Sequence, residues 1–176
     1  MNRTSKDFPN ENETTHAEMK YPPLEITRFF QAPVERVFNA WSDATLLKEW
    51  WGPIGFTCPE AEIDFRVGGR NLIAMKDPSG EIMWSTGEYR EIIPGQRIVC
   101  TDQFADDDGV AISAAEFGLP GAWPMILLLT LTFKKVGLDQ TKMDLKHEGI
   151  PPEMVEDCMQ GWNESLDKLR RLVERN

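Results

Sequence analysis

The sequence has few basic residues and no long apolar run. Its 176 residues hold 29 Asp and Glu against 19 Lys and Arg, which gives a formal net charge of -10. Because nucleic acids and anionic lipid surfaces attract cations, this acidic balance argues against both as partners. The longest apolar run, MILLL at 125–129, is far shorter than the roughly 20 residues of a membrane-spanning helix. We therefore expect neither nucleic-acid binding nor membrane insertion.

Cysteine is also scarce, which limits disulfide and metal chemistry. The three cysteines, Cys58, Cys100 and Cys158, are odd in number and have no C-x-x-C spacing, as expected for reduced thiols of a cytoplasmic protein. The acidic run DDDG at 106–109 lacks the alternating ligands and the later glutamate of a calcium loop. No zinc spacing, phosphate loop or nucleophile motif occurs. We expect no metal and no cofactor.

Composition divides the chain into a tail and one domain. Residues 1–23 contain almost nothing to bury, which predicts a disordered N-terminal tail without a signal peptide. Residues 24–176 are long enough for a single domain with a proper core and too short for two.

The first part of that domain predicts a strand and two short helices. LEITRFF at 24–30 indicates a strand, and apolar residues spaced by three to four over 34–41 indicate an amphipathic helix after Pro33. Ser42 and Asp43 offer an N-cap for a second helix, ATLLKEWW at 44–51. The Gly-Pro pair that follows closes this helix, because glycine adopts a left-handed conformation and proline cannot continue it.

The middle of the chain predicts an antiparallel meander, with apolar and polar residues alternating between turn signals. Together with the first strand this gives seven strands, the later six being expected at 58–65, 71–76, 82–93, 96–104, 125–135 and 140–148. A long loop at 105–123, with four acidic residues and no basic residue, interrupts the alternation of strands and turns.

The C-terminal segment predicts the longest helix. From Pro151 onward, apolar residues step by four and three, acids occupy the first turn and bases the last, which suits the helix dipole; these apolar residues are Val155, Met159, Trp162, Leu166, Leu169 and Val173. Gly161 lies inside this helix, where glycine costs about 1 kcal/mol against alanine. We expect a packing reason for it, such as close approach of a neighbour or room beside Trp162.

This order of elements resembles the helix-grip fold of the SRPBCC (START-like) superfamily. More closely, it is similar to the subfamily related to the C-terminal domain of activators of the 90-kDa heat-shock-protein ATPase. The resemblance covers about residues 24–174 and depends on several local patterns taken together: A-P-V-E-R-V-F-N-A-W at 32–41, E-W-W-G-P at 49–53, D-F-R-V-G-G at 64–69, G-E-Y-R-E-I at 87–92, H-E-G at 147–149 and G-W at 161–162.

The resemblance implies an α+β fold in which a curved antiparallel sheet of about six to seven strands surrounds a long C-terminal helix and leaves a cavity between them. Members include binders of small or lipid-like molecules, polyketide cyclases and chaperone-binding proteins, so the fold alone implies no single activity. We rank the binding of a small apolar or aromatic molecule first, a cyclase or hydrolase second and contact with a chaperone third. The 23-residue tail is too short for the separate N-terminal domain of the eukaryotic activators, and a non-enzymatic role is favoured.

Candidate site residues are placed by this implied fold. Adjacent helical residues point about 100° apart, so Trp50 and Trp51 cannot share one environment; either one fills the core while the other lines the cavity, or both seal the end of the core. The expected cavity lining is Trp41, Trp50, Trp51, Phe56, Trp84, Tyr89, Phe104, Trp123, His147, Met159 and Trp162.

Three residues are candidates for acid–base chemistry. His147, Asp102 and Tyr89 all fall on predicted strands, and His147 and Asp102 alternate with apolar neighbours, which predicts side chains that point inward. An enzyme requires at least two of them to converge in the cavity, whereas a satisfied core histidine is the alternative. An exposed edge strand can pair with a second copy of the chain, so the sequence is compatible with a homodimer.

Overall fold

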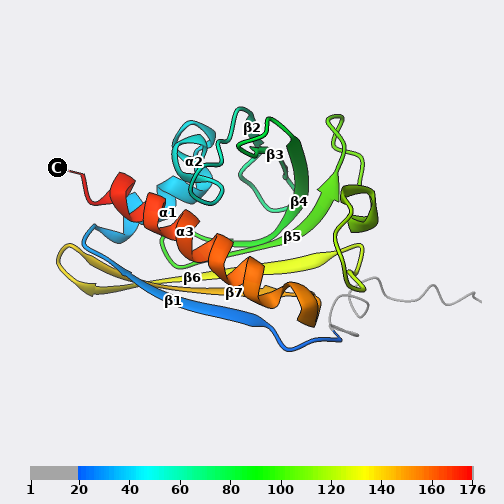
Figure 1. Ribbon diagram of the computed structural model, residues 1–176. Coiled ribbons are helices and arrows are strands. Elements are labelled where there is room, and N and C mark those ends of the chain that lie inside the picture. Colours follow the sequence, from blue (N-terminus) through cyan, green and yellow to red (C-terminus); the bar gives the residue numbers. More distant parts are fainter. Residues whose placement is uncertain (1–19, 176) are drawn as a thin grey trace, which may run out of the picture.

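A single antiparallel sheet curves around the C-terminal helix in the computed structural model, which describes residues 20–175 (Figure 1). The seven strands lie in the order β1-β7-β6-β5-β4-β3-β2. The elements are β1 (Leu24–Phe30), α1 (Val34–Ser42), α2 (Ala44–Trp50), β2 (Ala61–Ile63), β3 (Arg70–Lys76), β4 (Ile82–Ile93), β5 (Arg97–Ala105), η1 (Ala114–Phe117), β6 (Leu127–Gly137), β7 (Gln140–Glu148), η2 (Pro152–Met154) and α3 (Val155–Val173). This is the helix-grip architecture that the resemblance implied.

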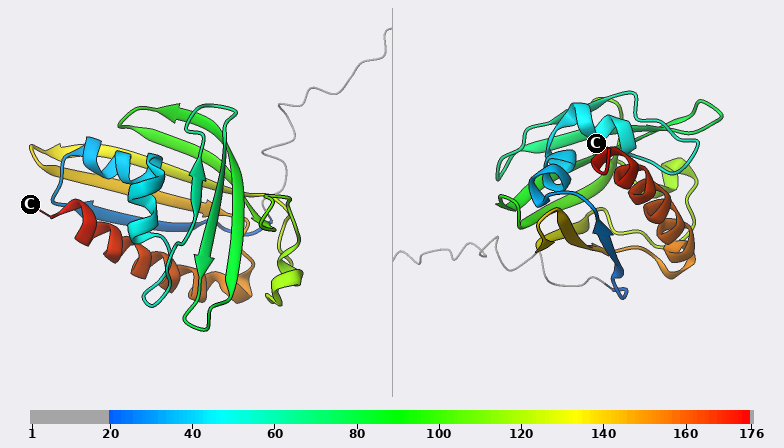
Figure 2. Two further views of the ribbon diagram at one scale, coloured as in Figure 1. Left: turned by 90° about the horizontal axis from the view of Figure 1, so that it is seen from above. Right: turned by 90° about the vertical axis from the view of Figure 1, so that its left-hand side faces the viewer.

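Helices and loops cover the inner face of the sheet unevenly. Figure 2 shows α1 and α2 near the last turns of α3, whereas the long loop that contains η1 lies near its first turns. No helix in the described range is long and apolar enough to cross a membrane. Of the predicted tail, residues 1–19 lie outside the described range, and the division into tail and domain stays a prediction.

The sheet bends sharply where β4 meets β5. A Cβ atom at Gly87 of β4 would lie 1.9 Å from the carbonyl oxygen of Thr101, so only glycine allows this approach. A register shift follows between Tyr89 and Glu91. Such irregularities increase the local bend of a strand, and here they turn the β2–β4 part of the sheet over α3.

The long helix has two halves with different surroundings. Leu166, Leu169 and Val173 in its second half are fully buried in the hydrophobic core, as the spacing predicts, where α3 packs against α1, α2 and β1. Trp162 and the residues before it are only partly buried. The core therefore lies under the second half of α3, and the first half spans a less filled space.

The second short helix ends one residue earlier than predicted. Asp43 caps α2 through a bond that the Leu46 amide donates at 3.0 Å, as the sequence indicates. However, Trp51 has extended torsion angles (φ -63°, ψ 131°), and Gly52 follows at φ +96°. Trp50 and Trp51 thus diverge because the chain leaves the helix between them.

Two predicted strands differ in length from those observed. The segment at 58–65 forms only the three residues of β2. β6 begins at Leu127. On one side β7 ends at Glu148, the partner of Leu128, and on the other side the end of β5 pairs with the long loop, through the Ile112 amide to Phe104 and the Ala105–Ala111 bridge, which leaves Met125 and Ile126 without a ladder. Both side chains are exposed. The predicted long loop also contains the short helix η1.

Candidate functional site

A cavity of about 380 Å³ lies between the sheet and the first half of α3. Its walls come from α3, from the segment 51–56 that follows α2, here called the rim segment, from β3, β4, β5 and β7, and from the long loop. The lining residues are Trp51, Gly52, Pro53, Phe56, Met75, Met83, Ser85, Asp102, Gln103, Phe104, Leu119, Trp123, Leu127, His147, Met154, Asp157, Cys158, Gly161, Trp162 and Ser165.

Two pairs of aromatic rings form corners of the cavity. The Trp51 and Trp162 ring centroids are 5.6 Å apart with an interplanar angle of 88°. The Phe104 and Trp123 centroids are 5.3 Å apart at 84°. In each pair the edge of one ring meets the face of the other, the preferred arrangement of aromatic quadrupoles. The cavity therefore has flat apolar walls that meet at right angles.

The neighbouring tryptophans of the sequence have different roles. Trp50 is 0% exposed, and its indole N–H donates to the carbonyl oxygen of Ala40 at 2.9 Å. Trp51 lines the cavity, and Trp41 packs behind it, with ring centroids 4.6 Å from Trp50 and 6.2 Å from Trp51. Of the two alternatives from sequence, this geometry matches a core Trp50 with a lining Trp51.

His147 is held between an indole and a carboxylate. The Trp162 N–H donates to His147 Nδ1 at 3.1 Å, and His147 Nε2 lies 3.1 Å from Asp102 Oδ2. An indole N–H can only donate, so Nδ1 accepts and the ring proton of this arrangement resides on Nε2. The Nε2 contact has the distance of an ion pair but not the direction of a hydrogen bond, and in the described range Nε2 has no hydrogen-bond partner. The buried ring thus keeps an unused donor beside a carboxylate.

The strand register explains why Asp102 and His147 meet. Leu129 of β6 pairs with Cys100 of β5 on one side and with His147 of β7 on the other. Asp102 follows Cys100 by two residues, so all of these side chains share the inner face. The inward orientation of Asp102 and His147 agrees with the alternation in the sequence.

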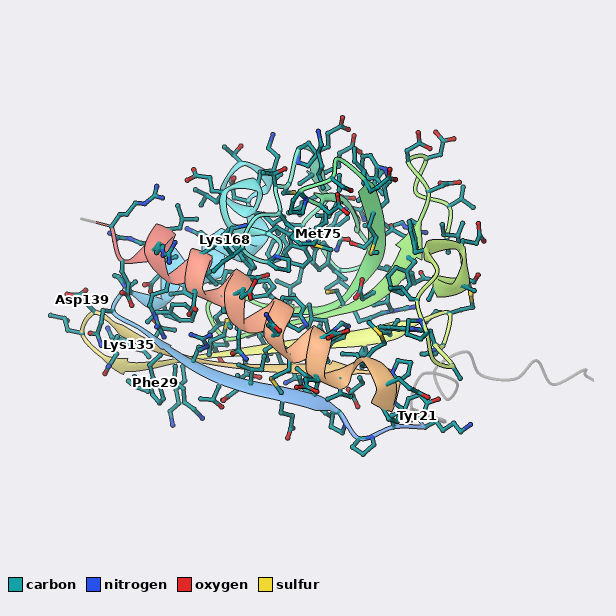
Figure 3. The ribbon with its side chains drawn as sticks, in the orientation of Figure 1. Tyr21, Phe29, Met75, Lys135, Asp139 and Lys168 are labelled. Atoms are coloured by element: carbon teal, nitrogen blue, oxygen red, sulfur yellow. The ribbon has the colours of Figure 1, made fainter. Side chains whose placement is uncertain are left out.

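The rim segment is fastened to α3 by a lysine and a glutamate. Lys168 Nζ donates to the carbonyl oxygens of Trp51 at 3.4 Å, Gly52 at 2.9 Å and Phe56 at 3.2 Å. Glu164 accepts from the Ile54 amide at 3.0 Å. Burial lowers the pKa of Lys168. In Figure 3, Lys168 lies on the upper side of α3, in the direction of Met75. One wall of the cavity is therefore fixed by polar bonds.

The predicted lining residues divide into two groups. Six of them line the cavity: Trp51, Phe56, Phe104, Trp123, His147 and Trp162. The other five, Trp41, Trp50, Trp84, Tyr89 and Met159, do not line it.

Strand and helix periodicity account for the second group. Met83 and Ser85 line the cavity, so Trp84 between them points to the opposite face of β4. Met159 lies in a groove on the outer face of α3. Tyr89 is 4% exposed and packs on Phe65, with ring centroids 5.1 Å apart, and burial raises its pKa. Of the three acid–base candidates, only Asp102 and His147 converge.

Sequence reasoning missed the methionines and the second acid of the cavity. Met75 and Met83 face each other across β3 and β4. The turn signal at 77–80 implied this pairing, because it fixes the hairpin register. Asp157 and Cys158 lacked such a signal, since they fall outside the apolar stripe of the helix.

The Cys158 thiol is poorly suited to act as a nucleophile. Burial raises its pKa to about 11, and the carboxylates of Asp157 and Asp102 add to this shift. The thiol therefore stays protonated near neutral pH. Among residues 20–175, no group of three or more His, Cys, Asp or Glu side chains is arranged to hold a metal ion.

Known proteins resemble this chain over nearly the whole described range. A crystal structure of a protein from Chromobacterium violaceum is 33% identical, with a TM-score of 0.73, and the match covers 88% of this chain and 98% of that one. The AHSA1 protein of Silicibacter pomeroyi is 25% identical, with a TM-score of 0.69 and coverage of 85% and 96%. A protein from Mycobacterium smegmatis, 22% identical at a TM-score of 0.72 over 88% and 91%, shows the same fold.

A search of curated proteins gives no match. The family model described as activator of Hsp90 ATPase homolog 1-like protein matches residues 31–174, which is most of the chain. Together with the helix-grip fold, this match shows that the chain belongs to the family of activator of Hsp90 ATPase homolog 1-like proteins.

Proposed function

We propose that this chain binds a small apolar or aromatic molecule in the cavity between the sheet and α3. The observation that carries the proposal is the lining, in which aromatic rings and methionines surround a few polar groups, among them the close pair Asp102 and His147. Ligand sites of soluble proteins are generally concave and apolar with a few convergent polar groups.

The size of the cavity limits the ligand. Its volume of about 380 Å³ corresponds to roughly a dozen water-sized atoms, at roughly 30 Å³ each. This is at the lower end of the range for small-molecule sites, roughly 300 to 1,000 Å³. A single ring with a short side chain matches this volume.

Mass spectrometry of the organic extract of gently purified protein tests the proposal. Gly161→Leu adds bulk to the cavity lining, and Trp162→Arg replaces an aromatic wall by a charged side chain, while Gln160→Arg adds the same side chain as the second variant on the exposed face of α3. We expect a defined small molecule in wild type and Gln160→Arg, and its loss from both blocked variants. If wild type carries nothing and a library of apolar ligands leaves its melting temperature unchanged, the proposal is wrong.

Proton transfer on the bound molecule is the second candidate function. Its supporting observation is the 3.1 Å approach of Asp102 to His147 inside the cavity. The Nε2–H would donate to a substrate carbonyl while the carboxylate accepts a proton, as in cyclase-type chemistry. Under this reading, Asp102→Asn abolishes turnover of the extracted molecule and leaves its binding in place. Contact with a chaperone, a homodimer through an edge strand and a cytoplasmic location stay predictions.

A further inference from the structure

The charged groups of the cavity are all of one sign. Asp102 and Asp157 line it, and within residues 20–175 no lysine or arginine does. His147 does not compensate them, because its Nδ1 accepts the indole N–H and its ring is then neutral. Asp102 has a side-chain exposure of 34%, so part of its carboxylate is open to an occupant of the cavity.

Neither Lys168 beside the rim segment nor Lys146 beside His147 lines the cavity, and Lys146 lies on the opposite face of β7. Lys168 directs its three N–H bonds at carbonyl oxygens of the rim segment. Lys146, next to His147 in sequence, pairs with Glu148 at 3.0 Å. The negative charges of Asp157 and Asp102 act on a group in the cavity lining, since both add to the raised pKa of the Cys158 thiol. A carboxylate in an apolar site is stabilised by an opposite charge, and this chain leaves that charge to a ligand.

The aromatic corners favour the same kind of ligand. A cation over the face of a tryptophan is attracted by the ring quadrupole, and the attraction grows when the site is shielded from water. Trp51 and Trp162 form one corner beside His147 and Asp102, and Phe104 and Trp123 form another. Rings at right angles next to a carboxylate are the arrangement that ammonium groups prefer.

From these observations we infer that the ligand is a small apolar or aromatic amine, bound as its ammonium cation with the charge between Asp102 and the Trp51–Trp162 corner. The inference rests on the proposed function and narrows it. It excludes fatty acids and other carboxylates, whose charge Asp102 and Asp157 would repel. The amine is then the hydrogen-bond donor to the Asp102 carboxylate, which His147 Nε2 approaches without a hydrogen bond.

Calorimetric titration with three compounds of the same phenylethyl body tests the charge. The probes are 2-phenylethylamine, 2-phenylethanol and 3-phenylpropanoate, at neutral pH and low salt. We expect the amine to bind about tenfold more tightly than the alcohol, which is about 1.4 kcal/mol, and the acid to bind most weakly. Asp102→Asn should reduce the ratio of amine to alcohol affinity to about one, while Glu62→Gln, which removes the same charge from an exposed position of β2, should leave the ratio unchanged.

The outcomes separate this inference from the proposed function. Equal affinity for amine and alcohol in wild type overturns the charge assignment and leaves an apolar binding site. Tighter binding of the acid also overturns it. If none of the three compounds binds, the inference is wrong, and the extraction experiment decides separately whether the cavity holds another molecule.

Discussion

Replacing Lys168 by methionine tests whether the rim segment depends on α3 for its position. Methionine keeps most of the apolar stem and removes the ammonium group, which makes two short bonds, to Gly52 at 2.9 Å and Phe56 at 3.2 Å, and one longer bond to Trp51 at 3.4 Å. Hydrogen bonds from charged groups contribute about 1.5–3 kcal/mol each when buried. Because Lys168 is only partly buried, solvent screens these bonds and we take the lower value for the two short ones.

After relief of the desolvation of the ammonium group, a loss of about 2 kcal/mol remains. In a domain of this size, 1 kcal/mol corresponds to a shift in melting temperature of roughly 2–4 °C, so Lys168→Met should lower it by about 4–8 °C. The control is Arg171→Met, which removes a charge from an exposed position near the end of the same helix. Hydrogen exchange adds a local measurement, because the Phe56 amide bonds to Pro53 within the segment and should exchange faster.

A melting temperature within 1 °C or so of the control would refute this reasoning. The contact of Glu164 with the Ile54 amide and the packing of Pro53 on Gly161 would then be sufficient to hold the segment.

Three other substitutions test the helix, the histidine and the thiols. Gly161→Ala should raise the free energy of unfolding by about 0.5–1 kcal/mol, since its Cβ would meet Pro53 at an ordinary 3.5 Å; a loss on urea denaturation would show a tighter packing requirement. Trp162→Phe should lower that free energy by about 1–3 kcal/mol, because His147 Nδ1 loses its donor; a change below about 0.5 kcal/mol would contradict the bond. Burial raises the pKa of Cys100 from 9.0 to about 12, so the stability from its neutral thiol is complete below pH 9 and is lost between pH 9 and 12. Cys100→Ala should therefore show a smaller loss over this range in denaturation at graded pH, and equal slopes would argue against the shift.

Much of the fold could be predicted because its local signals agree with each other. The strand 140–148, the capping by Asp43 and the stepping of Leu166, Leu169 and Val173 were each visible as periodicity or turn chemistry. The predictions were wrong where the length of a strand depends on its pairing with neighbouring strands. Met125 and Ile126 continue an apolar run, yet they are outside β6 because β7 ends at Glu148 and the end of β5 pairs with residues 111 and 112 of the long loop instead.

The cavity lining was harder to predict for two reasons. It depends on which side of each strand or helix faces inward, and the cavity occupies only part of the inner face of the sheet. Trp84 and Met83 are adjacent aromatic and apolar residues, and only the parity of β4 decides that methionine faces the cavity. Met159 and Trp162 are both on the apolar stripe of α3, but Trp162 lines the cavity whereas Met159 lies at the margin of the stripe, where it packs against the core on one side and borders the outer groove on the other. Aromatic content alone could not make this distinction.

The same geometry explains why the chain uses a row of tryptophans rather than one. Trp50 fills the core, Trp41 and Trp50 both pack behind Trp51, and Trp51 and Trp162 form the wall. Each ring contacts the next edge to face or tilted, so movement of a wall ring requires a core ring to repack. Trp162 also fixes the acceptor nitrogen of His147, which leaves the ring proton on Nε2, 3.1 Å from Asp102 but without a hydrogen bond to it. A binding site that is rigid before the ligand arrives loses little affinity to rearrangement of its side chains. Here the rigid wall and the fixed polar pair come from side chains that also stabilise the fold.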